Sequence, residues 1–265
     1  PFALVLIVSI TEEDAIISSG YRLFPEKISF KAYNIILGKG STVVNAYMIT
    51  IFITVIGTLM SILITSMLAY SLSVKQVKYR NKMAMYIFFT MLFSGGIVPW
   101  YILCTRYLHL KNTLLALILP MLVNPWNMFI LRNYFTKVPD SISDAAKIDG
   151  SGPFRTLFKI ILPLSIPVLA TVCLFYSLAY WNDWWLALML VEKSRLLPLQ
   201  YLLFKIQSDV IFAASEASKF SSRVSMPKES IKMATVVVAV GPIIFVYPFI
   251  QRYFVTGITL GSIKG

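Results

Sequence analysis

The chain has 265 residues, of which 57% are hydrophobic and 14% are charged, and its mean hydropathy is +0.74. Ordinary soluble domains are about 45–50% apolar and about 25% charged, so this composition favours a membrane protein. The net charge of +12 would suggest a nucleic-acid partner for a soluble protein. In a membrane protein, basic loops beside anionic lipid account for the charge, and we therefore predict membrane lipid and no nucleic acid as a partner.

The first 45 residues predict a short membrane segment and an external loop. Phe2–Ile10 is apolar but too short to span a bilayer. Because it lacks the basic start of a signal peptide, we interpret residues 1–10 as the end of a first transmembrane helix. Residues 11–45 are mixed and polar. Within them, the stretch Gly38–Thr42 lacks the first glycine of a phosphate-binding loop, so it predicts no nucleotide site.

Five longer apolar segments are long enough, or nearly so, for the roughly 20 residues that a transmembrane helix needs. They are Ala46–Ser73, Met83–Cys104, Leu114–Leu131, Leu164–Leu190 and Met233–Phe254. The glycines and prolines inside them predict kinks, which membranes tolerate where neighbouring helices satisfy the freed backbone groups. The predicted fold class is an all-α polytopic membrane protein with about six transmembrane helices, the first of them incomplete.

These segments predict the organisation of the chain. Residues 46–190 are expected to hold the core transmembrane helices, 191–230 an external loop, and 231–265 the last transmembrane helix with a cytoplasmic tail. The stretch Val74–Lys82 packs four basic residues into nine, which favours a cytoplasmic location for it. Total counts of Lys and Arg, 11 inside and 13 outside among 24, do not decide the orientation.

Residues 134–163 form the interruption between two spans that is predicted to lie in the cytoplasm. Val138-Pro139-Asp140-Ser141 has the residues of a helix start, because proline presets φ and Asp or Ser can cap. Ile142–Ile148 is long enough for about two helical turns, and Gly150, Gly152 and Pro153 end it. A helix then resumes over Phe154–Ile161. A short capped helix between spans is a surface element available to a partner.

A spaced motif in this loop resembles a known family. Asp144-Ala145-Ala146, three residues, Gly150, nine residues and then Ile160-Ile161-Leu162-Pro163 resemble the EAA motif of ABC importer permeases, with Asp144 in place of glutamate. Three further segments resemble carbohydrate permeases of the MalG-like and LplC-like branch, which serves oligo- or polysaccharide importers, an alginate-type system among them. These segments are Tyr107–Pro120, Trp181-Asn182-Asp183-Trp184 and Gln251–Gly265.

The resemblance implies a type I ABC importer permease fold and a division of labour between subunits. The chain lacks a Walker A motif, so ATP and Mg²⁺ are expected in a partner ATPase, and we predict no enzyme activity, metal or cofactor for this chain. Implied partners are a second permease in a heterodimer, two ATPase subunits and an extracellular or periplasmic sugar-binding protein, in a bacterial cytoplasmic (inner) membrane. The implied coupling residues are Asp144, Ala145, Ala146, Asp149, Gly150, Ile160, Leu162 and Pro163.

Polar and aromatic residues inside two predicted spans are candidates for the substrate path. Aromatic faces and planar amides suit a sugar, and polar groups in membranes usually face a bundle interior. Aromatic belts at the membrane surface and interhelical hydrogen bonds are the competing interpretations. The candidates are Asn124, Trp126, Asn127, Tyr180, Trp181, Asn182 and Asp183.

Two other classes of membrane protein remain as alternatives. A secondary transporter would need coupling-ion carboxylates near the membrane midplane, and Asp183 is the exception in spans that hold almost no acids. A membrane enzyme would need a paired acid and base, a nucleophile with its base, or a metal cluster. His109 is the single histidine, and Cys104 and Cys173 lack metal-ligand spacing, which disfavours that class.

Overall fold

The computed structural model describes residues 2–38, 40–219, 228–241 and 244. The described part of the chain is helical apart from loops and one isolated β-bridge between Thr11 and Ile28. The described residues divide into two compact units, one drawn from 1–50 and 183–247 and the other from 51–182.

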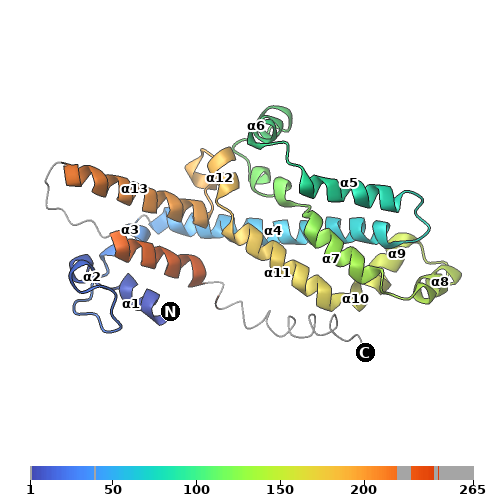
Figure 1. The fold of residues 1–265 in the computed structure, drawn as a ribbon, viewed down its shortest axis with the longest axis horizontal. Helices are drawn as coiled ribbons and strands as arrows, with labels where there is room; N and C mark the ends of the chain where they lie inside the picture. The colour runs from blue at the N-terminus through green and yellow to red at the C-terminus, as the bar shows by residue number, and fades with distance from the viewer. Residues whose placement is uncertain (1, 39, 220–227, 242–243, 245–265) are drawn as a thin grey trace. The chain divides into compact units, whose positions relative to one another are not determined.

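The second unit contains most of α4 (Gly40–Ser73) and the helices that follow it (Figure 1). In chain order these are α5 (Arg80–Leu92), α6 (Ile97–Ile102), η1 (Leu103–Tyr107), η2 (Leu114–Leu117), η3 (Leu119–Met121), α7 (Pro125–Phe135), α8 (Asp140–Ile148), α9 (Pro153–Thr156), η4 (Leu157–Ile161), α10 (Leu162–Leu164) and α11 (Ile166–Asn182).

The predicted spans are more sharply broken than the sequence suggested. Thr42–Ser73 of α4 is the one described helix that is long and apolar enough to cross a membrane by itself. Three further pairs pass that test only together, with bends of 113°, 49° and 89°, so the described residues hold up to four spans. A count of six stays a prediction, because much of Met233–Phe254 lies outside the described residues.

Glycine and proline account for two of these breaks. Gly96, between α5 and α6, has φ +87, a conformation that an L-residue adopts only at a cost. Asn124 is extended before Pro125, as expected for a residue preceding proline. Its side chain accepts a hydrogen bond from the backbone N–H of Asn127 at 3.2 Å and so caps α7. The breaks therefore follow from local backbone chemistry.

Two tyrosines of α11 join it to α4 and to the segments around α7. The Tyr180 hydroxyl donates to the carbonyl of Ile118 at 3.0 Å and shares a hydrogen bond with the Ser61 hydroxyl at 3.0 Å. The Tyr176 hydroxyl accepts from the backbone N–H of Asn124 at 2.9 Å and shares a hydrogen bond with Thr65 at 2.7 Å. Both rings are fully buried. Both tyrosine hydroxyls therefore have hydrogen-bond partners inside a core from which water is excluded.

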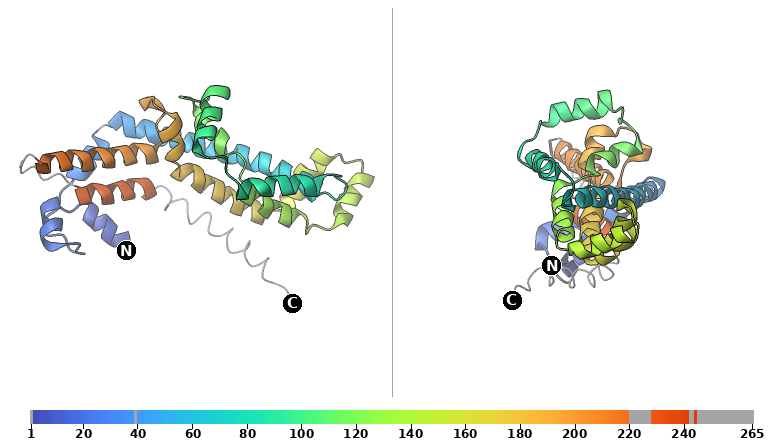
Figure 2. Two further views of the ribbon diagram at one scale, coloured as in Figure 1. Left: turned by 45° about the horizontal axis from the view of Figure 1, so that its top comes forward. Right: turned by 90° about the vertical axis from the view of Figure 1, so that its right-hand side faces the viewer.

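A single hydrophobic core runs through the second unit. It combines residues from α4, α5, α7, η4 and α11, which lie side by side in Figures 1 and 2. Its members are Ala69, Leu72, Ala84, Met128, Leu131, Phe135, Leu157, Ile161, Val168, Val172, Tyr176 and Tyr180. Leu157 and Ile161 belong to this core. The second half of the 134–163 loop is therefore packed against the helices of the second unit.

The first unit holds the N-terminal helices and the segments around 183–241. Residues 191–230, predicted as an external loop, contain a 21-residue helix, and their external position stays a prediction. Residues 228–241 are also helical. The other elements are α1 (Phe2–Ser9), α2 (Glu13–Ser19), α3 (Lys31–Leu37), the start of α4, α12 (Trp185–Leu190), η5 (Ser194–Leu196) and α13 (Leu199–Lys219).

A buried carboxylate from α2 caps the helix at 228–241. Glu13 accepts hydrogen bonds from the backbone N–H groups of Glu229 and Ser230 at 2.9 and 3.0 Å, and from the Ser230 hydroxyl at 2.9 Å. A negative charge at a helix N-terminus is favourable because it satisfies free N–H groups and opposes the helix dipole. Tyr21 donates to Glu229 at 2.8 Å, and Lys232 and Tyr21 together lower the pKa of that carboxyl.

The contact between Gly57 and Tyr180 generates a first prediction. A Cβ atom on Gly57 would lie 2.6 Å from Cζ of the Tyr180 ring, closer than van der Waals contact allows. We expect Gly57→Ala to destabilise the protein by about 1–3 kcal/mol, because an overpacked contact forces the helices apart. The measurement is the thermal unfolding midpoint of the purified protein in detergent.

Gly95→Ala is the matched control for this change. A Cβ atom on Gly95 would meet nothing within 4 Å, so this substitution is expected to leave the midpoint close to that of the parent. Equal midpoints for the two variants would contradict the importance of the Gly57–Tyr180 contact.

Candidate coupling loop and transport-path residues

The helix α8 has favourable residues at both ends. Pro139 is extended at its N-cap position, Asp140 lies in its first turn and Lys147 in its last turn. Acidic residues near the N-terminus and basic residues near the C-terminus both oppose the helix dipole. The boundary predicted from sequence, Ile142–Ile148, is thereby extended by two residues at its start. The helix is amphipathic, with Ala146 buried and Asp144, Ala145 and Ile148 exposed.

A left-handed glycine ends α8. Gly150 has φ +72, its N–H donates to the carbonyl of Lys147 at 3.0 Å, and the N–H of Ser151 donates to the carbonyl of Ala146 at 2.8 Å. These two bonds are those of a Schellman motif, in which glycine is the preferred left-handed residue. The turn that the sequence assigned to Gly150 is therefore present.

The outward face of this loop carries exposed apolar side chains beside acids. Ile148 is 87% exposed and Phe154 is 66% exposed, on either side of the Gly150 turn. Asp144 and Asp149 are exposed as well, and Asp144 forms an ion pair with Lys147 at 3.0 Å. Of the two motif alanines, Ala145 faces solvent and Ala146 faces inward. The exposed surface is thus a small apolar patch edged by carboxylates.

The later residues of the motif attach the loop to the helical core. Leu162 is partly buried against the core of the second unit, and Ile160 is half-buried. Pro163 is exposed in α10, where the chain turns toward α11. The residue of this stretch that is most deeply buried is Ile161, which the motif leaves unspecified.

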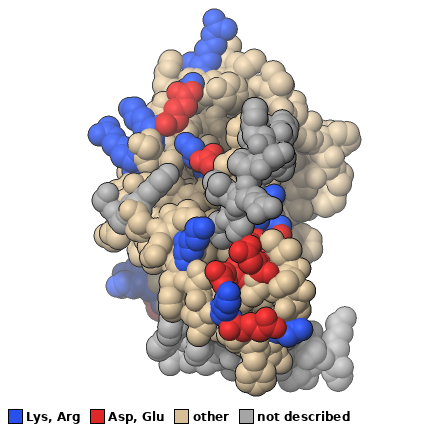
Figure 3. Space-filling model, turned by 90° about the vertical axis from the view of Figure 1, so that its left-hand side faces the viewer, with Lys and Arg blue, Asp and Glu red and all other residues tan. Residues whose placement is uncertain are grey.

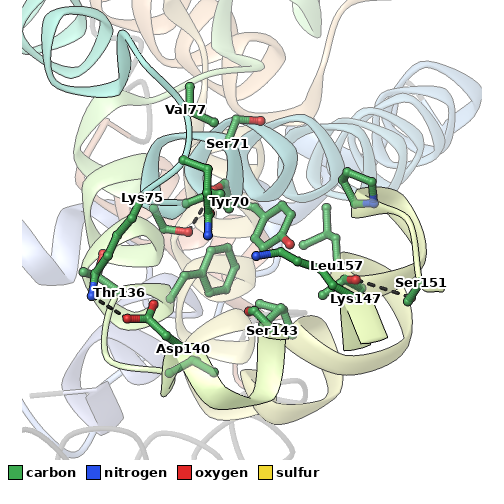
Figure 4. A pocket seen from close by; sticks show the side chains of 18 of the residues that line it. Tyr70, Ser71, Lys75, Val77, Thr136, Asp140, Ser143, Lys147, Ser151 and Leu157 are labelled. Carbon is green, nitrogen blue, oxygen red and sulfur yellow. Dashed lines mark hydrogen bonds and ion pairs between the residues drawn. The ribbon is translucent and has the colours of Figure 1, made fainter. Parts of the chain in front are cut away.

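A cavity of about 310 Å³ lies behind α8, between it and the Ser73 end of α4 (Figure 4). Lys75 forms an ion pair with Asp140 across the side of this cavity, and the Lys147 side chain extends into it toward Tyr70. The ion pair is exposed, and pairs of this kind typically contribute about 0–1 kcal/mol. Sequence reasoning missed it, because residues 65 apart give no pairing signal.

Two arginines hold the end of α4 beside this cavity. Arg132 of α7 donates from Nε to the carbonyl of Leu72 at 3.2 Å, and Arg80 of α5 donates to the carbonyl of Ser73 at 3.3 Å. Cations that donate to the last carbonyls of a helix satisfy acceptors with no partner inside the helix. The Ser73 end of α4 is therefore bonded to α5 and α7, near the place where α8 and α9 lie in Figure 2.

The predicted path residues of the second unit fall into exposed and buried groups. Trp126 is 63% exposed in the first turn of α7, and Asn124 and Asn182 are also exposed. Asn127 and Tyr180 are buried, and the hydroxyl of Tyr180 is fully used in hydrogen bonds inside the chain. In this conformation Tyr180 is therefore a packing residue with no surface for a substrate.

Trp181 and Asp183 lie at and beside the end of α11. Trp181 is half-buried, and Asn182 donates to the carbonyl of Leu178 within its own helix at 2.9 Å. Asp183 precedes α12, and one of its carboxylate oxygens accepts from the N–H of Leu186 at 3.5 Å. The hydrogen bond between Tyr176 and the backbone of Asn124 was not predicted from the sequence. The sequence did carry a signal for this contact, because Ser61 and Thr65 place two hydroxyl groups on one face of α4, where tyrosine hydroxyls can bond them.

Comparison with known proteins identifies the class. Residues 66–260 match the family described as the binding-protein-dependent transport system inner membrane component, and the chain belongs to that family of ABC importer permeases. Its fold matches a crystal structure of a bacterial ABC transporter involved in the import of the acidic polysaccharide alginate. That match has a TM-score of 0.81 and 30% identity and covers 96% of this chain and 90% of the other.

Two curated relatives from Bacillus subtilis (strain 168) span the full chain. The polygalacturonan/rhamnogalacturonan transport system permease protein YtcP is 38% identical, and this chain covers 92% of its length. Protein LplC is 37% identical, with 89% of its length covered. An arabinooligosaccharides transport system permease protein AraQ from Halalkalibacterium halodurans is 30% identical over 82% of this chain. The chain is therefore a sugar-type ABC importer permease, as the loop motif and the three further segments predicted together.

The conformation of Gly150 generates a second prediction. Alanine in the left-handed conformation costs about 1–2 kcal/mol, so Gly150→Ala is expected to lower the thermal unfolding midpoint of the purified protein. Gly152→Ala is the matched control, since Gly152 has φ −71 and a Cβ atom there would meet nothing within 4 Å. If both variants unfold at the same temperature, the left-handed turn is not required.

Proposed function

We propose that this chain is the transmembrane permease subunit of an ATP-driven importer of sugar oligomers, and that α8 docks on an ATPase subunit. The observation that carries the proposal is the outward face of α8. It places Asp144 and Ala145 of the family motif on one exposed surface with Ile148, directly before the Gly150 turn. Ile148 is 87% exposed and Phe154 is 66% exposed on either side of that turn, and together these apolar side chains suit a protein partner.

The attachment of the loop suggests how motion of the ATPase would reach the membrane helices. The limb after the Gly150 turn contributes Leu157 and Ile161 to the core that also contains residues of α4, α7 and α11. Displacement of α8 would therefore move packed helices as well as a surface loop. A rocking motion of this kind requires ATP or sugar to bind the two states with different affinity.

The energy source in this proposal lies in other subunits. The chain lacks a Walker A motif, so ATP and Mg²⁺ are assigned to two partner ATPase subunits. A second permease would complete the path, and an extracellular or periplasmic sugar-binding protein would deliver the substrate. The membrane is the bacterial cytoplasmic (inner) membrane, with α8 on the cytoplasmic side and residues 11–45 outside.

A uronate-containing oligomer is the substrate to test first. The similar proteins include one named for polygalacturonan and rhamnogalacturonan transport and a transporter of the acidic polysaccharide alginate. The segments assigned to the outside hold 13 basic and nine acidic residues, and this surplus of four is consistent with a mild attraction of an anionic sugar. Exposed Trp126, Asn124 and Asn182 offer an aromatic face and planar amides, which are suitable contacts for sugar rings and hydroxyls.

Substitution of Ile148 tests the docking surface. We expect Ile148→Asp to abolish most co-purification of the ATPase subunit and most sugar-stimulated ATP hydrolysis, because it places a charge in the apolar centre of the contact. Its exposure means that the permease itself should unfold at the parent temperature. Lys137→Gln, an exposed change on the same loop outside α8, is the control. Parent-like assembly and hydrolysis for Ile148→Asp would refute docking through this face.

Substitution of the exposed path residues tests the substrate route. In proteoliposomes that contain the assembled importer, we expect oligogalacturonides to stimulate ATP hydrolysis more than neutral malto-oligosaccharides do. Trp126→Ala and Asn182→Ala should raise the concentration of sugar that gives half-maximal stimulation. Trp184→Ala is the control for losing a tryptophan outside the proposed path. The Trp184 ring stacks on the Phe204 ring, with 4.9 Å between the ring centroids. Unchanged stimulation for both path variants would make these residues packing residues.

A further inference from the structure

The connection between α4 and α5 is basic and holds no acid. Residues 74–82 contain three lysines and one arginine, and the sequence has no Asp or Glu anywhere from residue 27 to residue 139. On the face of the molecule drawn in Figure 3, by contrast, basic and acidic side chains lie next to one another. The ion pairs Arg22–Glu26 and Lys232–Glu229 of the first unit are of this kind. The charge of the α4–α5 connection therefore needs partners from farther away.

Two of its four basic residues are used inside the protein. Lys75 forms its ion pair with Asp140 of α8, and Arg80 donates to the carbonyl of Ser73 at the end of α4. These two side chains hold neighbouring elements together. They are therefore not available to a charged group from outside the chain.

The other two basic residues, Lys78 and Lys82, have no counter-charge. Both side chains are exposed, and neither has an ion pair or a hydrogen bond within the part of the chain that the structure describes. Their ammonium groups lie 5.5 and 5.7 Å from the centroid of the same ring, that of Tyr79, which is itself half exposed. Two cations and an aromatic hydroxyl thus gather at the start of α5 with no anion to neutralise them.

An apolar stripe leads away from this pair of cations along α5. Tyr86, Phe89 and Phe93 follow Lys82 at spacings of four, seven and eleven residues, which places all four on one helical face. The three aromatic side chains are 73%, 52% and 61% exposed, and the rings of Phe89 and Phe93 stack at 4.2 Å. Ala84, on the opposite side of α5, is buried in the core of the second unit. The stripe therefore faces away from that core.

The length of the stripe matches one leaflet of a bilayer. Residues 83–93 carry no charge, and α5 ends just before the break at Gly96. Eleven helical residues extend about 16 Å, and half of a hydrocarbon core of about 30 Å is about 15 Å. Two unneutralised cations at one end of an apolar stripe of this length are complementary to a phospholipid, with an anionic headgroup and an acyl chain.

We propose that Lys78, Lys82 and Tyr79 bind the phosphate headgroup of an anionic phospholipid whose acyl chain lies along the aromatic stripe of α5. Basic clusters beside a membrane helix attract anionic headgroups, and tyrosine is favoured at the same depth. The proposal goes beyond the import function and needs only that α5 enters the bilayer, not a particular orientation of the chain. A helix of the second permease is the competing occupant of the stripe.

The test places a fluorophore at Thr90→Cys, an exposed position beside Phe89, in the assembled importer. The importer is reconstituted with phosphatidylglycerol or phosphatidylcholine brominated along the acyl chain, at matched mole fractions. Each lysine near a headgroup favours an anionic lipid about fivefold, so we expect phosphatidylglycerol to bind about 30-fold more tightly than phosphatidylcholine, as measured by quenching. Signal from Cys104 and Cys173 is subtracted with the labelled parent protein.

A pair of double variants identifies the lysines responsible. Lys78→Gln with Lys82→Gln is expected to bring the two lipids to nearly equal affinity. Lys137→Gln with Lys159→Gln is the matched control, because it removes the same charge from exposed positions outside the cluster and should keep the preference. If the Lys78 and Lys82 variant keeps the preference as well, these lysines do not select the lipid and the proposal is wrong.

Three further outcomes would overturn the proposal. Equal quenching of the parent by both lipids would mean that the stripe contacts ordinary bilayer lipid. No quenching by either lipid would mean that a protein, such as the second permease, covers the stripe. Reversal of the phosphatidylglycerol quenching by an excess of soluble glycerol phosphate would make the cluster a site for a free phosphate compound. Quenching that is selective, dependent on Lys78 and Lys82, and unaffected by glycerol phosphate supports the lipid site.

Discussion

Tyr176 and Tyr180 of α11 reach across the small and hydroxyl-bearing face of α4, and the arrangement of the second unit depends on this contact. In lipid, helices gain little from removing apolar surface from their surroundings, so close packing and interhelical hydrogen bonds must hold them together. Gly57 lets the Tyr180 ring approach the α4 backbone, and Ser61 and Thr65 share hydrogen bonds with the two phenols. The same phenols also bond the backbone at Ile118 and Asn124.

Those backbone bonds matter because the chain is broken where they occur. The helices around residues 114–124 are short, and bends leave peptide groups without helical partners. In a membrane such groups must find partners inside the protein. The tyrosine hydroxyls supply two of them, so the kinked path around Asn124 is stabilised by α11. Asn124 and Trp126, the exposed path candidates, therefore lie at the start of α7, where the hydrogen bond to Tyr176 holds the backbone.

The 134–163 loop is attached to this core on both sides. Near the start of the loop, Phe135 of α7 lies in the core, and toward its end Leu157 and Ile161 do. Between them, α8 is linked to the end of α4 by the exposed Lys75–Asp140 pair across a cavity. The Schellman turn at Gly150 gives α8 a defined exit direction.

The sequence by itself determined the class of protein, the loop motif and the positions of the main breaks. Apolar length separates a membrane chain from a soluble one. The Asp144–Pro163 spacing resembles a family motif that can be read along the chain, so neither conclusion needs the fold. Tertiary structure decided which polar residues are structural and which are exposed. Tyr180 and Trp126 look equivalent as sequence, yet one is buried with its hydroxyl satisfied and the other is open. Only contacts between segments far apart, such as Ser61 with Tyr180 and Glu13 with Ser230, make that distinction.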